Sequence, residues 1–179
     1  MRNYLFLLIM LVACRQQVIS KPAGAGITDT TIFSEFEDTS SRMMHEDTGM
    51  GARIVAFAKT LKGVPYKYCS MTPNGGFDCS GFVNYVFNHF DIKVPRSSVD
   101  FTNEGEDVEL GKSRPGDLIL FTGTNAKNRK VGHIGIITGN DKGEISFIQS
   151  TSGEAYGVVV SQLDKNYMAR FIKVIRILK

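Results

Sequence analysis

Residues 77–90 have the sequence FDCSGFVNYVFNHF, and the spacing of its apolar side chains predicts a helix that faces the protein core. Apolar positions three and four residues apart mark one helical face, and here they are Cys79, Phe82, Val83, Val86, Phe87 and Phe90. Asp78 is a good N-cap, because its carboxylate accepts hydrogen bonds from backbone N–H groups of the first turn. The pattern therefore places Cys79 in the first turn of a buried helix.

Cys79 is placed where a thiol can become a nucleophile. The positive end of the helix dipole and the unpaired N–H groups of the first turn both stabilise a thiolate. Asp78 is negative and partly opposes this effect, so a base must assist. The alternative is an inert buried cysteine, which is the more common role of an isolated cysteine on an apolar stripe.

His133 is the histidine best placed to act as that base. His45 lies in a polar N-terminal segment. His89 lies in the last turn of the predicted helix, about 15 Å along its axis from the thiol. His133 opens an apolar strand, and Gly135, on the same face of that strand, presents no side chain and leaves room for the thiol.

The strand that His133 opens belongs to a predicted hairpin. Residues 131–138 and 144–149 are strands flanking turn residues. A hairpin centred on Asp141 places Gln149 directly across from His133, close enough for its side-chain oxygen to accept an imidazole N–H. Nucleophile, base and orienting amide together follow the logic of a catalytic triad.

The other predicted elements indicate an α+β fold. Residues 52–61 have apolar side chains at helical spacing, and the helix ends before glycine and proline. Three further strands are expected at residues 118–121, 157–160 and 170–177. Helices that precede a run of strands favour α+β over alternating α/β units.

Four motifs carry a resemblance to a known family. They are Gly63-Val64-Pro65-Tyr66-Lys67-Tyr68, Phe77-Asp78-Cys79-Ser80-Gly81-Phe82-Val83, Arg114-Pro115-Gly116-Asp117-Leu118 and Gly132-His133-Ile134-Gly135-Ile136. In order and spacing, residues 53–178 resemble the NlpC family of bacterial cell-wall (murein) cysteine peptidases. The resemblance implies a papain-like fold with N-terminal helices packed on an antiparallel sheet, and it makes Cys79 the expected nucleophile.

The resemblance also implies roles for residues near the nucleophile. The Tyr66 hydroxyl is expected to hold the oxyanion together with the Cys79 backbone N–H. Asp78 and Ser80 are expected to meet polar groups of the substrate, and Arg96 its carboxylate. The alternatives are a core tyrosine, simple capping residues and a structural ion pair.

Two residues depart from the family pattern. Cys69 stands where the family often has glycine, and Gln149 stands where histidine is commoner. Cys69 is expected to be a small buried residue, and the alternative is an inhibitory disulfide with Cys79. The Arg114–Leu118 motif is interpreted as structural.

The function implied by the resemblance is hydrolysis of an amide bond beside D-glutamate or diaminopimelate in peptidoglycan stem peptides. A cysteine thiolate performs this reaction without a metal or cofactor. Two alternatives remain on the same fold. One is a non-catalytic peptidoglycan-binding lipoprotein, and the other is an acyltransferase with an acceptor other than water.

The N-terminus predicts export and lipidation. Arg2, the apolar run 4–12 and Ala13 have the build of a signal peptide over residues 1–13, and nine apolar residues are too few for a membrane-spanning helix. Cys14 follows directly, and residues 11–14 resemble the lipobox of bacterial lipoproteins. The alternative is a signal peptide followed by an incidental cysteine.

The predicted organisation is a lipidated Cys14 with a polar, flexible tether over residues 14–49, and a catalytic domain over residues 50–179. Apolar side chains at residues 32–36 offer an alternative, in which this segment docks on the domain as an N-terminal arm. The expected location is the bacterial cell envelope, with the lipoprotein facing the periplasm or the wall.

Composition excludes some other classes. Lys plus Arg total 21 against 18 Asp plus Glu, with no tight basic cluster, so nucleic acid is not an expected partner. Three cysteines are too few, and oddly numbered, for a disulfide framework. A chain of 179 residues supports one catalytic domain, which we expect to be monomeric.

Overall fold

A computed structural model describes residues 49–179. The predicted signal peptide, the lipid attachment at Cys14, the tether up to residue 48 and His45 lie outside the described residues. Within residues 49–179, no helix is both long enough and apolar enough to cross a membrane.

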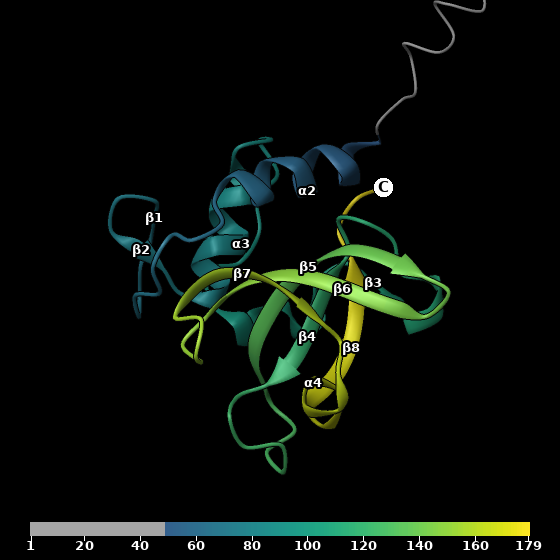
Figure 1. Ribbon diagram of the computed structural model, residues 1–179. Coiled ribbons are helices and arrows are strands. Elements are labelled where there is room, and N and C mark those ends of the chain that lie inside the picture. The colour runs from purple at the N-terminus through teal and green to yellow at the C-terminus, as the bar shows by residue number, and fades with distance from the viewer. Residues whose placement is uncertain (1–48) are drawn as a thin grey trace, which may run out of the picture. The chain divides into compact units, whose positions relative to one another are not determined.

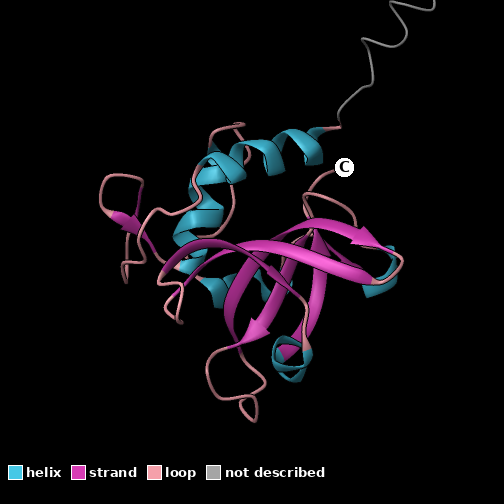
Figure 2. Cartoon of the chain, viewed as in Figure 1, coloured by secondary structure: helices cyan, strands magenta, loops and turns pink. Residues whose placement is uncertain are grey.

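The fold is a six-stranded antiparallel sheet with helices on its faces (Figures 1 and 2). The strand order is β3-β8-β4-β5-β6-β7. The strands are β3 (Glu106–Val108), β4 (Leu118–Thr122), β5 (Val131–Asp141), β6 (Glu144–Thr151), β7 (Gly157–Gln162) and β8 (Phe171–Arg176). All neighbouring pairs in this sheet are antiparallel.

Two apolar clusters cover the two faces of the sheet. The larger joins helices α2 (Met50–Thr60) and α3 (Cys79–Asn88) to one face. The smaller covers the other face with side chains of β4, β5, β6 and β8, together with Tyr167 of the short helix α4 (Lys165–Arg170). Every residue of β4 is buried, as expected for a strand between two cores. The predicted α+β arrangement of N-terminal helices on an antiparallel sheet is confirmed.

The predicted hairpin exists, but its turn and register were predicted wrongly. The turn contains only Lys142 and Gly143, whose φ angles of 51° and 92° match the type I′ turn of two-residue hairpins. Ile136 pairs with Ile148 rather than with Ser146, and an irregularity follows Ile137. Up to Ile137 the register is therefore displaced by two residues, and beyond the irregularity, where Gly139 pairs with Ser146, by three. Because side chains alternate with period two, the shift of two leaves His133 and Gln149 on their predicted faces.

Several short elements escaped prediction. They are β1 (Met71–Thr72), β2 (Gly76–Phe77), the 3₁₀ turns η1 (Ser98–Asn103) and η2 (Leu110–Lys112), β3 and α4. Helix α4 replaces the expected start of the last strand at Arg170. Its N-cap was visible in the sequence, because Asp164 accepts hydrogen bonds from the N–H groups of Asn166 and Tyr167, both at 2.9 Å.

The Arg114–Leu118 motif is structural, as interpreted. Asp117 is 1% exposed, and its carboxylate receives two hydrogen bonds from Arg176 at 2.8 Å and one from the Arg114 N–H at 2.8 Å. Gly116 has a φ of 92°, a conformation that favours glycine. The motif thus joins the start of β4 to β8.

Candidate active site

Cys79 is the first residue of α3, as predicted. The Asp78 carboxylate caps the helix by accepting a hydrogen bond from the Gly81 N–H at 2.6 Å. A Cβ atom on Gly81 would lie 2.2 Å from the Ser70 carbonyl oxygen, so only glycine fits there. The FDCSG motif therefore holds the loop before α3 against the first turn and fixes where the thiol stands.

Two groups of opposing effects act on the Cys79 thiol. Burial raises its pKa above the ordinary value, and the negative charge of Asp78 raises it further. Backbone N–H groups of Ser80, Cys79 itself and Ile134 lower it. The raising effects prevail, so the resting side chain is a thiol and needs a base to become a thiolate.

His133 and Gln149 are in contact, as predicted. Oε1 of Gln149 faces Nε2 of His133. The Gln149 amide nitrogen donates to Oγ of Ser161 at 2.8 Å and to the Tyr167 hydroxyl. Both amide hydrogens are thus engaged, and Oε1 can only accept, so the His133 proton sits on Nε2. This leaves Nδ1 as the nitrogen that can accept a proton.

The contact arises by a different route from the one predicted. Continuing the observed register by one pair places Gln149 opposite Gly135. His133 lies two residues before Gly135, and its side chain is therefore on the same face of the sheet. We expected Gly135 to leave room for the thiol, and this expectation was wrong. A Cβ atom there would lie 2.7 Å from the Phe147 ring and 3.5 Å from Cβ of Gln149. The glycine instead admits these neighbouring side chains.

Removal of the His133 ring from water lowers its pKa from 6.5 to about 4. The hydrogen bond with Gln149 raises this pKa, and the nearby positive charge of Arg170 lowers it. The imidazole is therefore neutral at neutral pH. With a protonated Cys79, the resting pair consists of a thiol and a neutral base.

A bulge orients His133. Phe121 of β4 pairs with His133, and Thr122 pairs with Val131, so Gly132 is the extra residue of β5. A Cβ atom on Gly132 would lie 2.7 Å from the backbone nitrogen of Gly123, which only glycine permits. Bulges of this kind redirect a side chain beside a functional site.

Tyr66 is held by backbone hydrogen bonds near Cys79. Its N–H donates to the Tyr156 carbonyl oxygen at 3.0 Å, and the two rings meet edge to face. Burial raises the pKa of the Tyr66 hydroxyl, and the negative charges of the Cys79 thiolate, once it forms, and of Asp78 raise it further. The hydroxyl therefore keeps its proton and can donate a hydrogen bond to a developing oxyanion.

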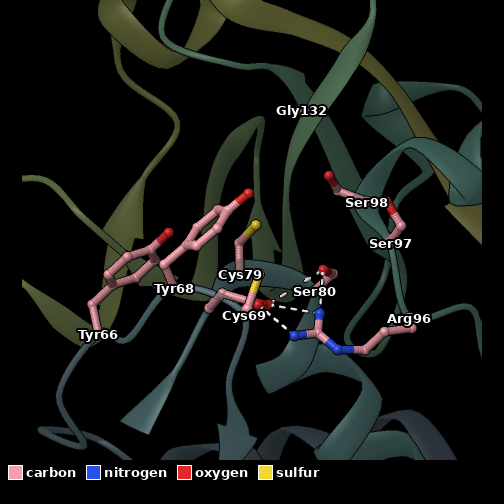
Figure 3. A pocket seen from close by; sticks show the side chains of 10 residues that line it. Tyr66, Tyr68, Cys69, Cys79, Ser80, Arg96, Ser97, Ser98 and Gly132 are labelled. Atoms are coloured by element: carbon pink, nitrogen blue, oxygen red, sulfur yellow. Dashed lines mark hydrogen bonds and ion pairs between the residues drawn. The ribbon is translucent and has the colours of Figure 1, made fainter.

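Asp78, Ser80 and Arg96 form one polar cluster. The Arg96 guanidinium donates to both carboxylate oxygens of Asp78, at 3.0 and 2.5 Å, and to Oγ of Ser80 at 3.2 Å. The Arg96 side chain remains 40% exposed. In Figure 3 the guanidinium turns toward Ser80, and Cys69 and Cys79 stand beside the cluster. Arg96 therefore forms a structural ion pair with Asp78, and part of its side chain remains exposed to the cavity.

Two cavities meet at the candidate nucleophile. The first, of about 540 Å³, contains the Arg96 cluster, Tyr68 and Cys69 (Figure 3). The second, of about 330 Å³, contains His133 and Arg170. Tyr66, Cys79 and Gly132 line both cavities. An extended substrate would therefore pass over the thiol, with one part in each cavity.

Cys69 lies at the surface, which contradicts the expected burial, and its thiol is free. Its φ is 58°, in the left-handed region that favours glycine. This explains why glycine suits the position.

His89 does not reach the site, because its ring stacks on Phe57 with the centroids 3.7 Å apart. No cluster of three or more potential metal ligands occurs among residues 49–179.

Sequence reasoning missed the residues that surround the base. Ser161 of β7, Tyr167 and Arg170 of α4 and the bulged Gly132 all line the second cavity or contact Gln149. Only the capping aspartate of α4 could have indicated them.

Comparison with known proteins shows the family of the chain. Residues 63–176 match the NlpC/P60 family. The chain belongs to that family. It is 36% identical over 115 residues to the gamma-DL-glutamyl hydrolase of Bacillus subtilis, an alignment that covers 64% of this chain but only 26% of that protein. It is 26% identical over 163 residues to the murein DD-endopeptidase MepS/murein LD-carboxypeptidase of Escherichia coli K12, covering 89% of this chain and 81% of that protein.

A solved NlpC/P60 structure supports the same assignment. The chain superimposes on an NlpC/P60 family protein of Bacillus cereus with a TM-score of 0.65 and 26% identity, over 73% of this chain and 41% of that one. The family membership and the papain-like fold expected from the four motifs are thereby confirmed.

Proposed function

We propose that this protein is a cysteine endopeptidase of the bacterial cell wall, which hydrolyses an amide bond beside D-glutamate or diaminopimelate in peptidoglycan stem peptides. The observation that carries this proposal is that Cys79 and His133 line one cavity while the buried Gln149 holds the base. Membership of the NlpC/P60 family and similarity to a gamma-DL-glutamyl hydrolase support the substrate class.

Acylation begins with transfer of the Cys79 proton to Nδ1 of His133. The thiolate attacks the amide carbonyl, and the Cys79 backbone N–H and the Tyr66 hydroxyl stabilise the oxyanion. His133, now protonated on both nitrogens, donates the Nδ1 proton to the departing amine nitrogen as the C–N bond breaks. A thioester on Cys79 and a free amine result.

Deacylation uses the same groups in reverse. Nδ1 of His133 takes a proton from water, the hydroxide attacks the thioester, and the proton returns to the Cys79 sulfur as the C–S bond breaks. Throughout the cycle Gln149 keeps the ring in the Nε2–H form, so Nδ1 stays available. Asp78, Ser80 and Arg96 contact the polar groups of the acyl part.

The test is release of soluble fragments from purified peptidoglycan, identified by mass spectrometry. Wild type and Cys69→Ala should release stem fragments cleaved at one bond, and Cys79→Ala should release none while melting at the same temperature. Absence of fragments from every wall type would favour a binding module. Transfer of the acyl group to an added amine in preference to water would favour an acyltransferase.

We further propose that the enzyme is anchored in the cell envelope through lipidation of Cys14, after removal of residues 1–13. The apolar run and the lipobox-like residues 11–14 support this proposal. Full-length protein should partition into detergent and carry a lipid mass on its N-terminal peptide, whereas Cys14→Ser should not. Mature soluble protein that begins at another residue would contradict it.

A further inference from the structure

Arg170 is the positively charged residue that lines the second cavity. Within residues 49–179 it forms no ion pair, and its buried Nε atom has no hydrogen-bond partner. Its guanidinium lies 5.5 Å from the centre of the Tyr167 ring, and the Tyr167 hydroxyl in turn contacts Gln149. The guanidinium thus lies near the base with its buried Nε–H donor unpaired among the described residues.

The rest of the cavity lining suits a negatively charged ligand. Apart from Arg170, the described residues that line it are neutral at pH 7, with hydroxyls from Thr124, Thr151 and Ser152 and no carboxylate. An arginine in such a cavity presents a fork of N–H donors that matches a carboxylate. In the first cavity, by contrast, Asp78 already engages the Arg96 guanidinium through two hydrogen bonds.

The position of His133 indicates which part of the substrate enters this cavity. The residue that takes the thiol proton must later donate it to the departing nitrogen, so the leaving amine lies beside the imidazole. His133 lines the second cavity and is absent from the lining of the first. The second cavity therefore holds the leaving group, and the first holds the acyl part.

We propose that Arg170 binds a carboxylate of the leaving group and makes the enzyme selective for stem peptides that carry this carboxylate beside the scissile nitrogen. This inference rests on the proposed endopeptidase function. Diaminopimelate has two carboxyl groups, and a carboxyl group that is not itself part of a peptide bond is a free carboxylate at neutral pH. Amidation of that group removes its charge. Arg170 would distinguish these two forms.

The experiment compares two synthetic substrates that are identical except that a leaving-group carboxylate is free in one and a primary amide in the other. Wild type should cleave the carboxylate substrate with a kcat/KM about tenfold or more above that of the amide. Arg170→Gln should lower kcat/KM for the carboxylate substrate by roughly ten- to a hundredfold, the range for a lost hydrogen bond to a charged group. In Arg170→Gln, kcat/KM for the amide substrate should change less than about threefold. In Arg170→Lys, kcat/KM for the carboxylate substrate should lie between the values of wild type and Arg170→Gln.

The ratio of the two substrates separates recognition from indirect effects. Loss of Arg170 also removes a charge that lowers the pKa of His133, but that effect is common to both substrates. Arg129, exposed and outside this cavity, provides the matched control, and Arg129→Gln should keep the wild-type ratio. Equal cleavage of both substrates by wild type, or equal losses in Arg170→Gln, would overturn the proposal while leaving the endopeptidase function intact.

A second measurement does not require turnover. The leaving-group peptide alone should slow alkylation of Cys79 by iodoacetamide when its carboxylate is free, and not when it is amidated or when Arg170 is glutamine. If the free carboxylate protects Cys79 in this way but neither substrate is cleaved, the proposed endopeptidase function is refuted, while carboxylate binding by Arg170 is supported. Equal protection by the two peptides would refute the site.

Discussion

Gln149 offers a sharp test of how the base is held. It is fully buried, its Oε1 accepts from His133, and its amide nitrogen donates to Ser161 and Tyr167. Gln149→Ala would remove the acceptor and leave the imidazole N–H unpaired in a site screened from water. The cost of such an unpaired group is about 1 to 3 kcal/mol. If this cost adds to the activation free energy of acylation, the acylation rate falls roughly ten- to a hundredfold.

Alanine also leaves a cavity, which would destabilise the fold independently of catalysis. Gln149→Met separates the two effects, because methionine is of similar length but offers no comparable acceptor. We expect Gln149→Met to acylate about as slowly as Gln149→Ala, with a smaller loss of thermal stability. Gln149→Glu should retain acylation and raise the pKa of His133, because a carboxylate accepts the N–H and stabilises the imidazolium.

The assay is the single-turnover rate of acyl-enzyme formation at matched pH, with thermal melting as the folding control. Gln149→His, which restores the residue commoner in the family, should retain substantial activity. A methionine or alanine variant that acylates at the wild-type rate would refute the orienting role. A glutamate variant with an unchanged pH profile would show that residue 149 does not act through the imidazole.

Other expected outcomes follow from the same site and fold. Alkylation of Cys79 should be slow at pH 7 and rise with an inflection above pH 9, because the pKa of the thiol is raised; a reactive plateau near pH 5 would indicate a preformed ion pair. The folded pKa of His133, about 4, lies below the value of 6.5 for the unfolded chain, so the free energy of unfolding should rise between pH 4 and 6.5 by up to about 3 kcal/mol, and this component should vanish in His133→Asn. Asp117→Asn should lower stability by about 2 to 4 kcal/mol in urea titrations, because it breaks a largely buried ion pair. Its control, Glu109→Gln in an exposed pair, should change stability by less than about 0.5 kcal/mol. Cys69→Ala should retain peptidoglycan hydrolysis, and loss of activity in that variant would contradict the assignment of the nucleophile.

Local sequence patterns determined the elements that carry the nucleophile and the base. The helix that begins at Cys79, its Asp78 cap and the strand containing His133 follow from residue spacing and capping, which depend on neighbours only a few positions away. The contact between His133 and Gln149 was also predicted correctly, although the register was wrong by two residues. That error was harmless because the side chains of a strand alternate with period two.

The tertiary structure alone decided how the site is completed. The bulge at Gly132, the irregularity after Ile137 and the left-handed backbone at Cys69 depend on how distant segments pack, and short windows of sequence do not specify them. Tyr167 and Arg170 approach His133 only because α4 packs beneath the sheet, more than thirty residues along the chain. Sequence thus determined which groups perform the chemistry, because helix and strand periodicities are local. The environment that sets their protonation and their substrate contacts arises from long-range packing.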